Sequence, residues 1–208
     1  MNRRDAIGRV GLILGGTIIG AEFFMSGCKS GSTANTEDLS KPETTAFLDE
    51  VGETILPETS TPGAKAAKVG AFMALMVKDC YTEADQKVFQ EGIGKLDDAS
   101  NAKFSKKFME ITAAQRTELL TGLDAEAKEY AKKKSADADA DKIKHAGEKD
   151  YKAPDVPNHY FTMMKQLTLL GYFTSEVGAT KALRYVPVPG KYIGDYPYKK
   201  GDRAWALS

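Results

Sequence analysis

The sequence predicts an all-α protein: a small irregular helical bundle that ends in a long, extended, Pro/Tyr-rich C-terminal tail. Apolar residues recur at three- and four-residue spacing in several successive segments, which is the period of one face of a helix. Capping residues precede several of these segments, and prolines and glycines separate them. We therefore expect a single helical domain with its tail over residues 42–208.

The first helix is expected between Pro42 and Pro57. Ser40 can cap it, proline is favoured in the first turn of a helix, and the second proline ends the segment. A loop with a proline-glycine turn signal follows over residues 58–63, and a second helix is expected over residues 64–80. The apolar stripe of the first helix consists of Phe47, Leu48, Val51 and Ile55.

Capping patterns mark the next two helices. A Thr-x-x-Asp pattern at residues 82–85 begins a helix that should reach about Leu96, and the Thr-x-x-Gln capping box at residues 112–115 begins one that should reach about Lys133. Residues 135–152 are charged and of low complexity, which indicates a solvated helix end or an exposed loop.

Two more helices are expected near the C-terminus. Residues 158–170 are apolar on much of the helix circumference, so we expect this helix to be central in the bundle, and a short helix is expected over residues 175–183. Beyond them, Pro187, Pro189 and Pro197 disfavour regular structure.

The tail is nevertheless rich in aromatic residues, whereas a disordered segment would be poor in them. We therefore expect it to lie flat on a surface, and two surfaces are open: that of a partner, or the core of this domain itself. The aromatic residues of the tail are Tyr185, Tyr192, Tyr196, Tyr198 and Trp205.

Neither a catalytic nor a metal-binding pattern is apparent. His145 and His159 lack the cysteine cluster or the Glu-x-x-His spacing of a zinc or iron site. No dinucleotide-binding, phosphate-loop, nucleophile-elbow or haem-attachment motif occurs. Two pairs of adjacent carboxylates, Asp49-Glu50 and Asp97-Asp98, cannot face each other on a helix, so we interpret them as solvated.

Alternating aspartates and a lone cysteine were the remaining candidates for chemistry. Asp137, Asp139 and Asp141 lack the glycine and the final glutamate of an EF-hand loop, so a solvated segment explains them better than calcium binding. Cys80 ends an apolar helical run, which favours a buried, inert thiol; the alternative is an interchain disulfide.

The N-terminus has the layout of an export signal. Arg3 and Arg4 precede a short apolar run over residues 7–21, and the sequence Met-Ser-Gly-Cys follows at residues 25–28. The arginine pair indicates the twin-arginine route, which exports folded proteins, and the small residues before Cys28 indicate a lipobox in which Cys28 is acylated. A membrane-spanning anchor is the alternative, but it needs about 20 apolar residues, and Glu22 ends the run too early.

This assignment makes residues 1–27 a signal peptide and residues 28–41, which are small and polar, a flexible tether. The signal peptide carries three basic and two acidic residues, and the whole chain has a formal net charge of zero, so the mature chain carries about −1. Such a balance gives no electrostatic reason to expect a nucleic-acid partner.

Two segments resemble a known family. G-E-T-I-L-P-E-T-S-T-P-G-A-K-A-A-K-V at residues 52–69 is similar to its first motif, an Ile-Leu-Pro turn followed by T-P-G-A-x-x-A. Residues 171–190, continued by residues 197–205, are similar to its closing motif. Both belong to the gluconate 2-dehydrogenase subunit 3 family, the small subunits of membrane-associated sugar and polyol dehydrogenases.

The resemblance implies an accessory, non-enzymatic role. In that family the FAD and the chemistry belong to a large subunit of the glucose–methanol–choline oxidoreductase type, so this chain is expected to hold no cofactor. The small subunit carries the twin-arginine signal, and the large subunit is exported with it. A cytochrome subunit is a further candidate partner. A lipobox cysteine is not a fixed feature of the family, so lipid anchoring rests on residues 25–28 alone.

Together these observations predict a lipid-anchored small subunit on the periplasmic side of a bacterial membrane. The alternative is a scaffold or binding lipoprotein without an oxidoreductase partner. The residues expected to contact the partner lie in the closing motif and the tail: Tyr172, Phe173, Arg184, Tyr185, Pro187, Pro189, Tyr192, Tyr196, Tyr198 and Trp205.

Overall fold

The computed structural model describes residues 39–188, 190–191 and 193–206. This part of the chain is helical and contains no β-strand, which confirms the predicted fold class. The predicted signal peptide, with Arg3, Arg4 and Cys28, lies outside the described residues, and so do Pro189 and Tyr192. The helices are α2 (Pro42–Ile55), α3 (Val69–Cys80), α4 (Glu83–Phe104), α5 (Ala113–Lys144) and α6 (Tyr160–Thr174), with short turns η2 (Ala64–Ala67), η3 (Phe108–Glu110) and the π-helical η4 (Gly178–Ala182).

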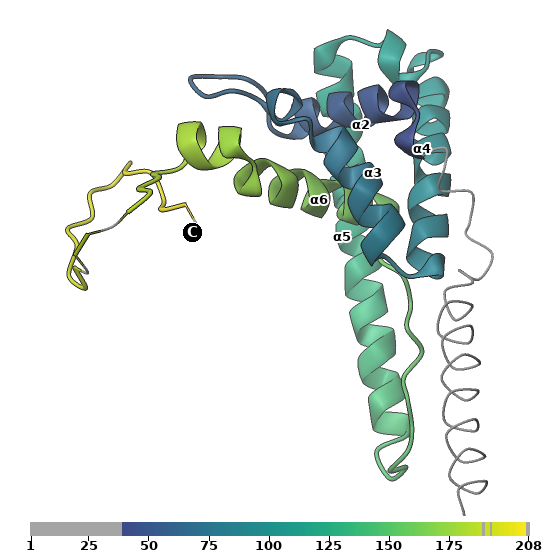
Figure 1. Ribbon diagram of the computed structural model, residues 1–208. Coiled ribbons are helices and arrows are strands. Elements are labelled where there is room, and N and C mark those ends of the chain that lie inside the picture. Colours follow the sequence, from purple (N-terminus) through teal and green to yellow (C-terminus); the bar gives the residue numbers. More distant parts are fainter. Residues whose placement is uncertain (1–38, 189, 192, 207–208) are drawn as a thin grey trace, which may run out of the picture. The chain divides into compact units, whose positions relative to one another are not determined.

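Helix α6 is the centre of the packing, as its apolar circumference predicts. It contacts α2, α3, α4 and α5 (Figure 1). Two glycines let its neighbours approach closely: a β-carbon on Gly171 would come within 2.6 Å of Phe72 Cδ1, and one on Gly92 of α4 would collide with Tyr160. The buried residues of α6 are Tyr160, Phe161, Met163, Met164, Leu167, Thr168, Gly171 and Tyr172.

The capping patterns of α4 and α5 are confirmed, whereas the expectation that Ser40 caps the first helix is wrong, because Lys41 precedes α2 and makes no side-chain cap hydrogen bond. The backbone N–H of Asp85 donates to Thr82 Oγ1 at 3.2 Å, and α4 begins at the next residue after Thr82. At the start of α5, Thr112 and Gln115 form the complete reciprocal box: the N–H of Gln115 donates to Thr112 Oγ1, and the N–H of Thr112 donates to Gln115 Oε1. These bonds satisfy donors that a helix N-terminus otherwise leaves unpaired.

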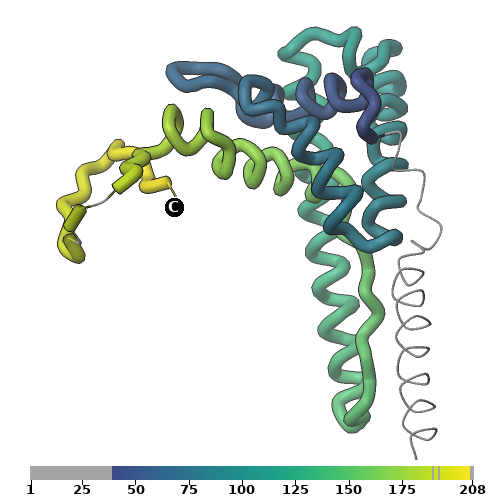
Figure 2. The backbone as a smooth tube through the Cα atoms, in the orientation of Figure 1, coloured from purple at the N-terminus to yellow at the C-terminus, as the bar shows by residue number. Residues whose placement is uncertain are grey.

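Helix α5 is longer than the sequence analysis predicts. It continues past Lys133 to Lys144, and its buried residues stop at Ala127. The second half of the helix is therefore a solvated helix end, one of the two forms expected for this charged stretch. The chain then returns along it (Figures 1 and 2): Tyr130 Oη donates to the carbonyl of Pro157 at 3.0 Å, and Lys134 Nζ donates to Asn158 Oδ1 at 2.9 Å.

Other boundaries also differ from expectation: α6, for example, ends at Thr174 and not at Leu170. The segment expected as one helix over residues 64–80 is divided at Lys68, whose left-handed backbone (φ 54°) separates η2 from α3. Helix α4 extends to Phe104, beyond the expected end at Leu96. Leu39, placed in the tether by its polar neighbours, is 1% exposed and belongs to the core. None of the helices among the described residues is long and apolar enough to span a bilayer.

Candidate functional site

Glu53 of α2 fixes the loop that carries the first motif. Its two carboxylate oxygens accept hydrogen bonds from the backbone N–H groups of Glu58 and Lys65, each at 2.8 Å, so one side chain holds both ends of the loop. From α6, Tyr172 Oη donates to the carbonyl of Pro62 at 2.6 Å. Tyr172, one of the predicted partner-contact residues, is buried at 3% exposure, and its hydroxyl group contacts the loop.

The adjacent carboxylates are not solvated, contrary to the sequence analysis. Asp49 Oδ1 accepts from the N–H of Gly70 at 2.7 Å, near the N-terminus of α3, where a negative charge is favourable. Asp97 Oδ1 accepts from the N–H of Phe108 at 3.0 Å. Glu50 also has partners, Arg116 and Lys65. Three of the four carboxylates therefore face neighbouring segments, and only Asp98 is exposed as expected.

Arg116 joins three segments. It forms an ion pair with Glu50 of α2, and it donates to the carbonyls of Phe108 at 3.0 Å and Met109 at 2.9 Å. Lys65 pairs with the same glutamate at 2.8 Å. The hydrogen bond from Lys65, opposed by burial and assisted by Arg116, lowers the pKa of Glu50 below its ordinary value of 4.5. These interactions connect α2, η2, η3 and α5.

The two histidines lie at helix ends. His159 is the N-cap of α6: its Nδ1 accepts from the N–H of Phe161 at 3.3 Å, and burial lowers its pKa below 6.5. His145 ends α5 and stacks on Tyr151 with ring centroids 3.9 Å apart. Among the described residues, no group of three or more His, Cys, Asp or Glu side chains could hold a metal ion.

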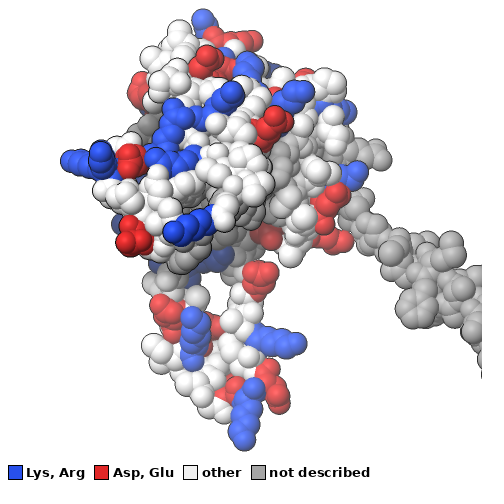
Figure 3. Space-filling model, turned by 60° about the vertical axis from the view of Figure 1, so that its left-hand side comes forward, with Lys and Arg blue, Asp and Glu red and all other residues white. Residues whose placement is uncertain are grey.

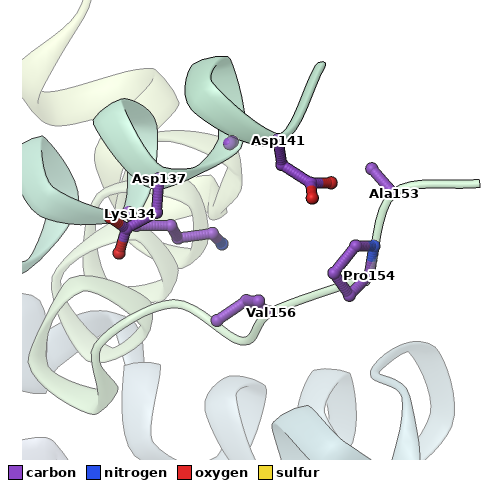
Figure 4. Close-up of a pocket in the computed structure, with 7 residues that line it drawn as sticks. Lys134, Asp137, Asp141, Ala153, Pro154 and Val156 are labelled. Carbon is purple, nitrogen blue, oxygen red and sulfur yellow. The ribbon is translucent and has the colours of Figure 1, made fainter. Parts of the chain in front are cut away.

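The alternating aspartates lie on the solvated half of α5. Asp139 pairs with Lys142 at 3.3 Å, whereas Asp137 and Asp141 line a hollow of about 270 Å³ between the helix and the returning chain. In Figure 4, Pro154 and Val156 form the opposite wall. A straight helix cannot wrap three carboxylates around one ion as a calcium loop does.

Cys80 is exposed, so the expectation of a buried thiol is wrong. The apolar residues that precede Cys80 in the sequence form the buried face of α3. Cys80 itself lies in the last turn of the helix, beside Lys78 and Asp79, which are also exposed. An interchain disulfide at Cys80 stays a prediction.

Arg184 closes the tail on itself. It pairs with Trp205 in a parallel bridge, in which the N–H of Arg184 donates to the carbonyl of Ala204 at 2.8 Å and its carbonyl accepts from the N–H of Ala206 at 2.9 Å. Its guanidinium lies over the rings of Trp205 (4.8 Å) and Tyr196 (5.3 Å), a cation–π arrangement. The tail is therefore non-helical but has internal contacts. These contacts hold Tyr196 and Trp205, two of the predicted partner-contact residues, beside Arg184.

The described aromatic residues of the tail do not cover the core. Tyr198 is 76% exposed and Trp205 49%, and no described residue after Tyr172 is among the buried hydrophobic residues. This disfavours the alternative in which the tail aromatics are part of the domain's own core. The other predicted contact residues that are exposed are Phe173, Tyr185, Pro187 and Tyr196, while Arg184 is half-buried.

The sequence analysis missed apolar members of this surface. Val186, Val188 and Ile193 are exposed, and Val188 reaches 81%. With Gly190, Lys191, Tyr196 and Trp205 they line a hollow of about 560 Å³. The Val-Pro-Val-Pro sequence was the available signal, because its prolines prevent a helix that could bury the valines.

Comparison with known proteins identifies the family. The model of the family described as gluconate 2-dehydrogenase subunit 3 matches residues 42–190, which is more than half of the chain and includes every helix described above. No match was found among curated proteins or among solved structures. The matched residues include the first motif and residues 171–190 of the closing motif. The chain therefore belongs to the gluconate 2-dehydrogenase subunit 3 family, as its two motifs predict.

Proposed function

We propose that this chain is the non-catalytic small subunit of a flavin-dependent dehydrogenase complex. It folds with a large subunit of the glucose–methanol–choline type, is exported together with it, and holds it at the membrane. Membership of a family of dehydrogenase subunits is the observation that carries this proposal.

The side chains that would be candidates for chemistry support an accessory role, because they maintain the fold. Glu53 and Asp49 hold loop and helix ends, Glu50 pairs with Arg116, and His159 caps α6. The tail instead offers exposed aromatic and aliphatic side chains. Contiguous exposed apolar surface of this kind is typical of sites that bind other macromolecules, and tyrosine and tryptophan are common in binding hot spots.

Export and anchoring follow from the sequence of the signal peptide. A twin-arginine signal suits a subunit that carries a folded, cofactor-loaded partner, since that route accepts folded proteins. Acylation at Cys28 would then attach the complex to the periplasmic side of the membrane, with each buried CH₂ contributing about 0.8 kcal/mol.

The test is recovery of the full-length, C-terminally tagged chain from detergent-solubilised membranes, with mass spectrometry and an absorption spectrum of the eluate. A flavoprotein that copurifies and shows the absorption spectrum of an oxidised flavin supports the proposal. An eluate without a flavoprotein would favour a scaffold lipoprotein.

The export step is tested with Arg3→Lys combined with Arg4→Lys. This variant keeps the positive charge but removes the arginine pair, so both subunits should accumulate in the cytoplasm. Arg9→Lys is the matched control, because it changes the same residue type within the same segment but leaves the pair intact. Normal export of the flavoprotein with the double variant would refute co-export.

A further inference from the structure

The tail differs from the rest of the mature chain in charge. Residues 183–208 contain five basic and two acidic residues, a net charge of +3. Because the mature chain carries about −1 in total, residues 28–182 carry about −4. A basic segment is thus attached to an acidic body.

The basic side chains of the tail are not neutralised within the described part of the chain. Lys191, Lys199, Lys200 and Arg203 are exposed, and none of them takes part in an ion pair between described residues. The side chain of Asp202 is occupied by a hydrogen bond from the N–H of Lys199 at 2.8 Å. Arg203 also donates to the carbonyl of Lys181 at 2.7 Å, a bond that leaves its charge unneutralised.

The tail that carries these charges also contains an apolar hollow. Val186, Val188, Ile193 and Trp205 line it, and Lys191 is part of its wall. Figure 3, which brings the left-hand side of Figure 1 forward, shows basic side chains beside uncharged areas, with some acidic side chains among them. An apolar centre with a polar, charged rim is the usual anatomy of a protein–protein interface.

We propose that the tail binds an apolar protrusion surrounded by Asp and Glu side chains on the large subunit. This inference rests on the proposed function and adds the chemistry of the partner's face. The proposed occupant is a protein, because the chain belongs to a family of dehydrogenase subunits; binding to an anionic lipid surface is a separate outcome of the experiment below. Complementary charge raises the association rate and makes the complex sensitive to salt.

The experiment measures the affinity of the mature chain for the large subunit at about 50 mM and about 500 mM NaCl, between which screening shortens the Debye length severalfold. The tail variant combines Lys191→Glu, Lys199→Glu and Lys200→Glu. The control combines Lys87→Glu, Lys106→Glu and Lys133→Glu, three exposed lysines on the body, and so makes the same change in net charge.

We expect the wild-type complex to weaken at least about tenfold at the higher salt concentration. The tail variant should bind about 10- to 100-fold more weakly at low salt and should lose most of the salt dependence, whereas the control stays within about threefold of wild type. Equal effects of the two triple variants, or an affinity independent of salt, would overturn the acidic-face proposal while leaving the subunit assignment intact.

Two other outcomes are distinguishable. If no flavoprotein binds the wild-type chain at either salt concentration, the proposed function itself has failed. The second outcome concerns lipid, and it uses the mature chain with Cys28→Ser. In this outcome the chain binds phosphatidylcholine vesicles that contain about 30% phosphatidylglycerol but not vesicles of pure phosphatidylcholine. If the tail variant then loses vesicle binding but still binds the large subunit as wild type does, the tail recognises lipid and the proposal is wrong.

Discussion

The body and the tail use the same residue types in opposite ways. In the body, Phe89, Phe108 and Phe161 are at most 2% exposed, whereas Tyr198 and Trp205 in the tail are about half exposed or more. Helical periodicity lets the body gather its aromatics on inward faces. The prolines of the tail prevent such a face, so its apolar side chains remain at the surface. Buried and exposed aromatic residues therefore lie in separate segments, and substitutions should separate stability from the proposed recognition.

The largest effect on stability is expected from the body. Phe161→Ala removes a side chain that is 2% exposed in α6, the helix that contacts all the others. Loss of buried area and the resulting cavity should lower the free energy of unfolding by about 3–5 kcal/mol. Chemical denaturation with urea measures the change.

The matched control is Tyr198→Ala in the tail, whose ring is 76% exposed. It should change the free energy of unfolding by less than about 0.5 kcal/mol. Similar losses for the two variants would show that the division between body and tail is wrong.

The next effect concerns the charged cluster. Arg116→Met removes the ion pair with Glu50 and the hydrogen bonds to two carbonyls of η3, leaving a partly buried carboxylate with only Lys65. The expected loss is about 2–3 kcal/mol, measured by the same denaturation experiment.

Lys132→Met is the control for Arg116→Met. Lys132 pairs with Glu129 at 2.6 Å, but both side chains are more than 70% exposed. Exposed pairs contribute little, so the change should stay below about 1 kcal/mol. If Arg116→Met is equally mild, the cluster does not stabilise the body.

A smaller, pH-dependent effect is expected at His159. Burial lowers the pKa of His159, and Lys95 adds to this while Glu126 opposes it, so the folded state favours the neutral ring. The unfolded chain binds the proton more readily; the stabilisation is therefore complete above the unfolded value of about 6.5 and is lost as pH falls through the lower folded pKa. A protonated Nδ1 also cannot accept from Phe161.

We expect the wild type to lose about 1 kcal/mol between about pH 7 and pH 5 through this group, a typical value for a helix cap. His159→Asn supplies a cap that does not titrate, so its stability should fall less over the same range. The comparison uses the slopes against pH, because asparagine also loses the ring contacts with Tyr130 and Tyr160. Parallel slopes would exclude His159 as the titrating group.

The sequence predicted the helices more accurately than their ends. The capping boxes located the starts of α4 and α5 to the residue, because they are local hydrogen-bond patterns. The end of α5 was missed because residues 134–144 lack an apolar stripe. Their alanines and lysines nevertheless favour helix, and no glycine occurs between Gly122 and Gly147. Hydrophobic periodicity arises when one face of a helix is buried, so a solvated helix does not show it.

The candidate site could be predicted only in part. The aromatic residues of the tail stood out by composition, and the described ones after Phe173 are exposed, whereas their contact with a partner stays a prediction. The buried position of Tyr172 depends on the loop carbonyl of Pro62, which is 110 residues away in the sequence. Likewise, the roles of Glu53 and Asp49 depend on which backbone N–H groups the fold brings to them. Such long-range partners leave no local signal.

The smallest effect on the body is expected from deletion of residues 187–208. No described residue in this segment belongs to the buried core, and the last apolar side chain packed against the core is that of Ala182. The truncated chain should therefore keep its cooperative thermal transition within a few degrees of wild type while the flavoprotein no longer copurifies, because the exposed aromatics and the basic residues are lost together. Calorimetry and affinity purification measure the two effects on the same preparation.

A decrease in Tm of about 10 °C, equivalent to a few kcal/mol for a domain of this size, would mean that the tail supports the fold. Retained copurification with an unchanged transition would instead place the binding surface on the helices, where Leu169, Leu170 and Phe173 of α6 are the exposed apolar residues nearest the tail in sequence.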